Sequence, residues 1–282
     1  MPLSPLLAPA DLHARLDAGE AIRLLDVRYR LDQPDGRPEY LAGHLPGAVY
    51  VDMDTELASH GAPSDGRHPL PSRETLQDAA RRWGLNDGDV VVVYDDYRSV
   101  AAARAWWLLQ RAGVEEVRVL DGGLGAWRAA GLPLEEGDVA PIPGSITLSD
   151  PAGGLTIDQA AAWPDRGLLL DARAPERYRG ATEPYDPIAG HIPGAVNLPA
   201  DAVLEGEAFA SPEAIRAAFA RAGATDDTPI AAYCGSGLTA AHTALAGASA
   251  GIDVAVYPGS WSQWSNTPGR PVATGADPRG GV

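Results

Sequence analysis

Ala42-Gly43-His44-Leu45-Pro46-Gly47-Ala48-Val49 recurs later in the chain as Ala189-Gly190-His191-Ile192-Pro193-Gly194-Ala195-Val196. Three other blocks also occur twice, in the same order within each half of the chain. These pairs are Leu24 to Arg28 with Leu169 to Arg173, Val91 to Tyr94 with Ile230 to Tyr233, and Leu120-Asp121-Gly122 with Tyr257-Pro258-Gly259. Four matched blocks in one order indicate that the chain is a tandem duplication.

The apolar runs within each copy are short, which is typical of strands in a parallel sheet covered by helices on both faces. We expect strands at 22–26, 90–94, 117–120, 167–171, 230–233 and 254–257, with helices between them. Helix starts are marked by the capping-box pattern at Thr156 and by Ser211-Pro212-Glu213. The alternation predicts an α/β fold, with a mostly parallel sheet and helices on both faces in each copy.

The stretch from Glu135 to Gly154 is rich in Gly, Pro and Asp and has no sustained hydrophobic period, as expected of a connection between domains. We therefore expect a first domain over residues 1–138, a linker over 139–154 and a second domain over 155–282.

The composition limits the partners. The chain has 282 residues, 45% of them hydrophobic and 21% charged, and a formal net charge of −16. This excess of acid argues against nucleic acid or an anionic membrane as a partner, because both would be repelled. The apolar runs are too short for a membrane span and the start lacks a basic region typical of a signal peptide, so a cytoplasmic location is expected.

Cys234 is the only cysteine, which excludes an intramolecular disulfide and a cysteine-rich zinc site. A lone cysteine is often only a small buried apolar residue. Cys234, however, follows a predicted strand and precedes a predicted helix, and ligands in parallel α/β folds bind beyond the carboxyl ends of strands. Its position favours chemistry, for which we expect neither a metal nor a cofactor.

The segment Cys234-Gly235-Ser236-Gly237-Leu238-Thr239 has the composition of an anion-binding loop. Two glycines let the backbone curl so that successive N–H groups converge, and the following helix adds its positive end. A thiolate or persulfide can be held there without a basic side chain, and Ser236 and Thr239 add hydroxyl groups. The alternative is a plain turn capped by Ser236. The first copy has Asp95 at the position of the cysteine and no glycine in the turn, which favours a specialised loop in the second copy.

The repeated blocks and the cysteine loop resemble the two-domain rhodaneses over nearly the whole chain. The resemblance implies a sulfurtransferase in which Cys234 takes a sulfane sulfur from 3-mercaptopyruvate or thiosulfate as a persulfide and passes it to a thiol or cyanide. It also implies an inactive first domain, a catalytic second domain and a site at their interface. Gly235, Gly237, Leu238 and Thr239 match the substrate-binding loop, which is closest to the mercaptopyruvate type.

The same resemblance assigns Arg177 to the anionic end of the donor, a role that suits its planar, permanently charged group. Mercaptopyruvate enzymes have a second arginine in a Glu-Pro-Arg segment, whereas this chain has Glu183-Pro184-Tyr185-Asp186. The resemblance further suggests that His44, with Ser236 and Asp35, assists proton movement.

Several of these residue types also have structural interpretations. His44 and His191 both lie in Gly-His-x-Pro-Gly, which favours a role in shaping the chain. The Asp-x-Arg pairs at 26–28 and 171–173 are expected to be internal ion pairs. The tryptophans are expected to be packing residues, with Trp261 and Trp264 as candidates for the border of the site.

Two other functions compete with sulfur transfer. A cysteine-dependent phosphatase needs an arginine six residues after the cysteine, where this chain has Ala240. A non-catalytic sulfur-sensing or binding protein would not need the intact loop of the second copy. Because each alternative conflicts with a feature of the loop, sulfur transfer is the favoured interpretation.

Overall fold

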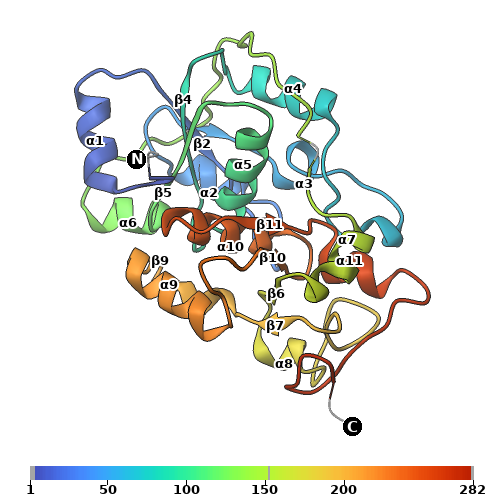
Figure 1. Cartoon of the computed structure of the whole chain (residues 1–282). Coiled ribbons are helices and arrows are strands. Elements are labelled where there is room, and N and C mark those ends of the chain that lie inside the picture. The colour runs from blue at the N-terminus through green and yellow to red at the C-terminus, as the bar shows by residue number, and fades with distance from the viewer. Residues whose placement is uncertain (1–3, 152, 281–282) are drawn as a thin grey trace. The chain divides into compact units, whose positions relative to one another are not determined.

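The computed structural model describes residues 4–151 and 153–280, which form two compact units (Figure 1). The first unit contains the residues up to Ser59, Leu70–Gly153 and Gly206–Phe209. The second contains His60–Pro69, Gly154–Glu205 and the residues from Ala210 onward. Two segments thus differ from the expected division: residues 60–69 of the first repeat belong to the second unit, and 206–209 belong to the first.

The first unit is built on a parallel sheet with the strand order β1-β5-β4-β2-β3. Its strands are β1 (Leu6–Leu7), β2 (Ile22–Asp26), β3 (Val49–Tyr50), β4 (Val90–Tyr94) and β5 (Glu116–Leu120), and β9 (Ala208–Phe209) also lies in this unit. Its helices are α1 (Pro9–Asp17), α2 (Arg37–Ala42), α3 (Met53–Glu56), α4 (Arg73–Arg82), α5 (Val100–Arg111) and α6 (Gly123–Ala129).

The second unit repeats this plan with the parallel strand order β11-β10-β6-β7. Its strands are β6 (Leu168–Asp171), β7 (Val196–Asn197), β8 (Leu204–Glu205), β10 (Ile230–Tyr233) and β11 (Val254–Val256). Its helices are α7 (Ile157–Ala162), α8 (Pro175–Tyr178), α9 (Pro212–Arg221), α10 (Leu238–Ser249) and α11 (Ser260–Ser265), with 3-10 turns η1 (Pro63–Asp65), η2 (Trp163–Asp165) and η3 (Ala200–Val203).

The predicted fold class is confirmed, and the six predicted strands form with bounds that differ by a residue at most at either end. The two-residue strands β1, β3, β7, β8 and β9 were not predicted. Both predicted helix starts also form. The Thr156 hydroxyl accepts a hydrogen bond from the Gln159 N–H, and the Gln159 side chain accepts one from the Thr156 N–H, so the capping box is complete. The Ser211 hydroxyl accepts a hydrogen bond from the Ala214 N–H.

The segment expected to be a linker is attached to the first unit as far as Gly153. Ile146 and Leu148 are buried, and the side chain of Gln77 in α4 bonds to the main chain of both. The segment is therefore not a free connection: Ile146 and Leu148 anchor it to the first unit, although Ile142 is exposed.

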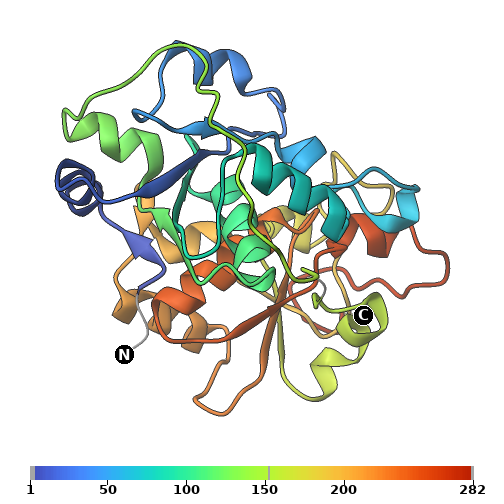
Figure 2. The same cartoon turned by 90° about the horizontal axis from the view of Figure 1, so that it is seen from above.

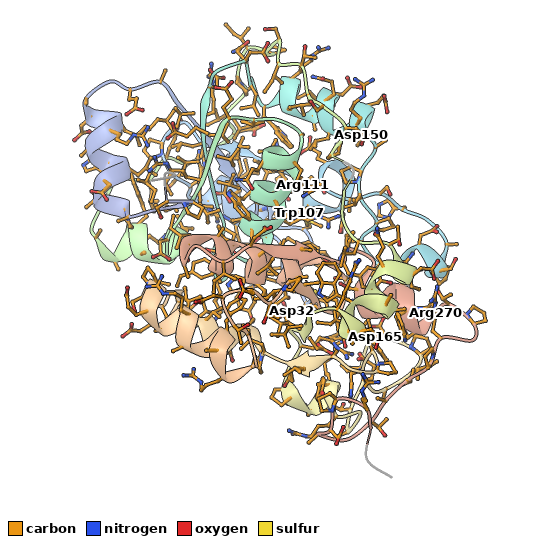
Figure 3. All side chains as sticks on the ribbon, in the orientation of Figure 1. Asp32, Trp107, Arg111, Asp150, Asp165 and Arg270 are labelled. Atoms are coloured by element: carbon orange, nitrogen blue, oxygen red, sulfur yellow. The ribbon has the colours of Figure 1, made fainter. Side chains whose placement is uncertain are left out.

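Each unit has an apolar core of buried side chains. In the first unit these are Leu7, Leu12, Leu24, Leu45, Ala48, Val92, Tyr94, Leu120, Leu124 and Trp127. In the second unit they are Ala160, Trp163, Leu169, Ile192, Ala195, Ala231, Tyr233, Tyr257, Trp261 and Trp264. Trp106 and Trp107 of α5 are buried, as expected, and the Arg111 guanidinium lies 5.2 Å from the centre of the Trp107 ring (Figure 3). Within the described residues, none of the helices is long and apolar enough to cross a bilayer.

The repeated Asp-x-Arg and Gly-His-x-Pro-Gly motifs make the same interactions near the ends of the strands in both units. Arg28 pairs with Asp26, and Arg173 pairs with Asp171, as predicted for Asp-x-Arg. Tyr94 ends β4 and Tyr233 ends β10. Their hydroxyl groups accept hydrogen bonds from the third residue of the Gly-His-x-Pro-Gly block, from the Leu45 N–H and the Ile192 N–H respectively. These bonds fix both strand ends, and so fix the turn that follows each strand.

Candidate active site

Cys234 lies in the turn between β10 and α10 and is 2% exposed. Its Sγ accepts a hydrogen bond from the Gly237 N–H at 3.1 Å. Gly237 has φ 91°, and a methyl group there would lie 2.5 Å from the Pro258 carbonyl oxygen. Only glycine fits this combination of backbone angle and space. The tight turn predicted from the two glycines is therefore present, and it directs an amide and the start of a helix at the sulfur.

The main chain around Cys234 is held by the start of α11. The Cys234 carbonyl accepts a hydrogen bond from the Trp261 N–H, and the Gly235 carbonyl accepts one from the Ser262 N–H. Leu238 is buried as the first residue of α10, and Thr239 is half-buried in the same turn. The loop is thus clamped between two helices.

Ser260 was not singled out by the sequence analysis, yet its hydroxyl accepts a hydrogen bond from the Cys234 N–H at 3.1 Å. The hydroxyl oxygen is 2.9 Å from the Tyr257 carbonyl and 3.9 Å from Sγ, so its one hydrogen can serve either acceptor. Ser260 has φ 52°, which is costly for a non-glycine residue. The matching position in the first copy is Gly123, with φ 55°; this glycine-to-serine difference is the sequence signal that could have pointed to Ser260.

Ser236 lies at hydrogen-bond distance from a histidine. The Ser236 Oγ and the His68 Nδ1 are 2.9 Å apart. His68 comes from the segment 60–69, which Figures 1 and 2 both show beside α11 as a blue stretch of chain. The segment is tied down by the Arg67 N–H, which donates to the Ser262 Oγ at 2.9 Å. Ser236 and His68 therefore form a polar pair that could not be predicted from the sequence.

Arg177, at the end of α8, lies beside the cysteine loop as the resemblance implied. A methyl group on Gly235 would be 3.3 Å from the Arg177 Nη1. The guanidinium is held by Glu183, at 2.7 Å, and is 3.4 Å from Asp186. It also lies over the exposed Tyr185 ring, 5.1 Å from its centre. This places a fixed positive charge next to the loop without any basic residue inside it.

The first unit has a carboxylate at the place of the thiol. Asp95 is buried, and its two oxygens accept four backbone N–H bonds at 2.9 to 3.0 Å, from Tyr97, Ser99, Ala101 and Ala102. Burial raises the pKa of the Asp95 carboxyl to about 7, against the lowering effect of these donors. The turn after the strand is thus a set of converging amides in this copy, and the protein's own side chain fills it.

His44 and Asp35 both belong to the first unit. The His44 Nδ1 is 2.9 Å from the Tyr40 carbonyl, and its ring stacks on the Tyr40 ring with centres 4.2 Å apart. His191 has the matching arrangement with Tyr178, which supports the structural interpretation of Gly-His-x-Pro-Gly. Asp35 accepts a hydrogen bond from the Arg37 N–H. A part for His44 and Asp35 in proton movement stays a prediction, and His68 holds the position beside Ser236.

Trp261 and Trp264 do not border an opening. Both are buried in the core of the second unit, and their indole N–H groups donate to the Ile188 and Pro271 carbonyls. Trp261 is also covered by the Arg173 guanidinium, which lies 4.5 Å from the centre of its ring.

Comparison with known proteins agrees with this arrangement. Residues 8–130 and 156–267 each match the model of the rhodanese-like domain. SseB of Mycobacterium tuberculosis H37Rv, whose name provisionally assigns it as a thiosulfate sulfurtransferase, is 46% identical over 96% of this chain and 97% of its own. The human 3-mercaptopyruvate sulfurtransferase is 38% identical over 88% of this chain and 86% of its own.

The fold is also that of a solved sulfurtransferase. The crystal structure of SseA from Escherichia coli, one of the 3-mercaptopyruvate sulfotransferases, superposes with a TM-score of 0.82 at 32% identity, covering 92% of this chain and 99% of SseA. Two matched domains, relatives that align over most of their length, and one buried thiol that accepts a backbone hydrogen bond lead to one assignment. The chain belongs to the rhodanese family as a tandem, two-domain member, and it is a sulfurtransferase.

Proposed function

We propose that the second unit transfers sulfur from 3-mercaptopyruvate, with thiosulfate as a slower donor, through a persulfide on Cys234. The observation that carries the proposal is the Cys234 Sγ held by the Gly237 N–H at the start of α10. The nucleophile in sulfur transfer is a thiolate, and a backbone amide and a helix N-terminus stabilise negative charge on the sulfur during the reaction. The loop around the reacting sulfur is formed by Gly235, Ser236, Gly237, Leu238 and Thr239.

The first step is attack of the Cys234 thiolate on the sulfur of mercaptopyruvate. The new bond is S–S, the C–S bond of the donor breaks, and its electron pair stays on carbon as the enolate of pyruvate. One proton completes the product pyruvate. The Ser236 hydroxyl can donate that proton. Its oxygen is 2.9 Å from the His68 Nδ1, so the imidazole can return a proton to it. The enzyme is left with a persulfide on Cys234.

The second step returns the enzyme to its starting state. A thiolate or cyanide attacks the outer sulfur of the persulfide, the S–S bond breaks, and its electron pair restores the Cys234 thiolate. The Gly237 N–H stabilises the anionic sulfur in both steps, and such a donor is most effective where water is excluded. The 2% exposure of Cys234 fits this requirement.

The preference for mercaptopyruvate rests on charge. The loop from Gly235 to Thr239 contains no basic residue, and the net charge of −16 disfavours a dianion such as thiosulfate more than a monoanion. The name of SseB points to thiosulfate instead, so the two donors need a direct comparison.

That comparison is a measurement of kcat/KM for both donors with cyanide as acceptor, for the wild type and Ser236→Ala. We expect mercaptopyruvate to be the better donor, and we expect the substitution to lower kcat for mercaptopyruvate about 10²-fold while leaving thiosulfate nearly unchanged, because only mercaptopyruvate leaves an enolate that needs a proton. A tenfold preference for thiosulfate, with Ser236→Ala silent on both donors, would contradict the proposal.

A further inference from the structure

Arg67 brings a second guanidinium to the cysteine loop, from a part of the chain far from Arg177 in sequence. A methyl group on Gly235 would lie 3.3 Å from the Arg177 Nη1 and 3.8 Å from the Arg67 Nη1. The two nitrogens are therefore no more than about 7 Å apart, since both are close to the same point. Gly235 has no side chain, so no side-chain atom of this residue separates the loop from the two cations.

Arg67 is held in place on three sides. Its Nη2 donates to the Asp186 Oδ1 at 2.6 Å, its backbone N–H donates to Ser262, and its guanidinium lies 5.5 Å from the centre of the Tyr185 ring. The Arg177 guanidinium is 5.1 Å from the centre of the same ring. One exposed tyrosine thus packs against both cations.

Asp186 has a particular part in this arrangement. It stands in the segment after Glu183-Pro184 where the family resemblance led us to expect a second arginine. Its side chain is 3% exposed, and its two oxygens face Arg67 and Arg177. Burial raises the pKa of Asp186, an effect that the two arginines oppose. Where a second arginine is expected, this chain therefore has Asp186, whose carboxylate holds Arg67 in place.

The charges in this cluster balance. The cations are Arg67, Arg173 and Arg177, and the carboxylates are Asp171, Glu183 and Asp186. Balanced, hydrogen-bonded charges avoid the cost of burying an unpaired ion. The bonds to Asp186 and Glu183 use Nη2 of Arg67 and the Nε and Nη2 of Arg177, whereas the atoms nearest Gly235 are the two Nη1 groups. Each guanidinium thus bonds to the carboxylates through one edge and turns its Nη1 group toward Gly235.

We propose that Arg67 and Arg177 together bind the carboxylate of an α-keto acid donor, with Arg67 as a specificity-determining residue. This inference rests on the proposed function. A carboxylate that accepts one hydrogen bond of about 2.9 Å at each oxygen can bridge two nitrogens within the upper limit of about 7 Å that the distances at Gly235 set. Two charged donors on one carboxylate give stronger and more directional binding than one. The clamp that appeared incomplete in the sequence is completed by the segment 60–69.

The test compares Arg67→Ala, Arg67→Lys and Arg270→Ala with the wild type. Arg270 is a matched control in the same unit (Figure 3): it pairs with Asp158 and packs on the Trp264 ring, and its side chain is 22% exposed against 24% for Arg67. We expect Arg67→Ala to raise the KM for mercaptopyruvate, and the inhibition constant of pyruvate, about tenfold or more with a much smaller change in kcat. Arg270→Ala should leave both constants unchanged.

Arg67→Lys keeps the charge but not the planar fork, so we expect it to recover only part of the loss. It also guards against misfolding of the alanine variant, because lysine can still pair with Asp186. Persulfide formation at saturating donor separates this inference from the proposed function. If the wild type forms no persulfide, the proposed function fails. If the wild type forms it and folded Arg67 variants keep the wild-type KM and the wild-type inhibition by pyruvate, Arg67 is not part of the clamp and this inference is overturned.

Discussion

Asp95 in the first unit occupies the position that Cys234 occupies in the second. Each follows the corresponding strand, and each carbonyl accepts a hydrogen bond at 2.9 Å from the matching residue of the next helix, Leu124 N–H to Asp95 and Trp261 N–H to Cys234. In one unit the turn holds the protein's own carboxylate, and in the other it holds a thiol. The same backbone arrangement thus serves an internal anion in one copy and a reactive sulfur in the other.

The buried Asp95 predicts a pH dependence of stability. Its pKa is about 7 in the folded protein and near 3.8 in the unfolded chain. Between these pH values the folded state keeps a proton that the unfolded state has lost, so the free energy of unfolding falls as the pH rises, by at most about 4 kcal/mol. We expect Asp95→Asn to remove this slope, measured by urea unfolding between pH 4 and pH 8. A wild type that gains stability over the variant as the pH rises would show that the four amide donors dominate.

Gly237 is predicted to be indispensable for the loop. Gly237→Ala introduces a methyl group 2.5 Å from the Pro258 carbonyl at φ 91°, and we expect it to cost at least about 2 kcal/mol and to abolish persulfide formation. Gly251→Ala is the control, since Gly251 has φ 76° and open space around it, so it should cost only about 1 kcal/mol and leave activity intact. Urea unfolding and a donor assay on both variants decide the matter, and an active Gly237→Ala enzyme would refute the role of the turn.

Arg177 is predicted to bind the donor and not to take part in the chemistry. Arg177→Ala should raise the KM for mercaptopyruvate about 10- to 100-fold with a smaller effect on kcat, the range for loss of a charge-assisted hydrogen bond. Arg177→Lys should recover little, because an ammonium group cannot reproduce the planar pair of donors. Arg216→Ala, which removes an exposed arginine paired with Glu213, is the control. Unchanged KM values for both Arg177 variants would remove this residue from the site.

Much of the architecture could be predicted because it depends on local pattern. The short apolar runs became the strands of two parallel sheets, and Thr156 and Ser211 begin helices for reasons visible within four residues. The turn at Cys234 could also be predicted, since Gly237 is required by the backbone itself.

The partners of the loop could not be predicted in the same way. His68 is 168 residues from Ser236, and Arg67 is 119 residues from Asp186, so no spacing rule joins them. The packing of residues 60–69 within the second unit brings them together. From the sequence alone, Tyr185-Asp186 stands where a second arginine is expected. In the structure Asp186 pairs with Arg67 and Arg177, so Asp186→Arg would remove the partner of Arg67 and place a cation beside Arg177.

The most direct test of the account is the mass of the intact protein after incubation with mercaptopyruvate and removal of excess donor. We predict that the wild type gains the mass of one sulfur atom, that cyanide removes it, and that Cys234→Ser, with the same thermal stability, gains nothing, because an alcohol does not attack a sulfane sulfur. A wild type that stays at its original mass with both mercaptopyruvate and thiosulfate, or a Cys234→Ser variant that gains the same mass, would contradict the central claim that Cys234 carries the sulfur.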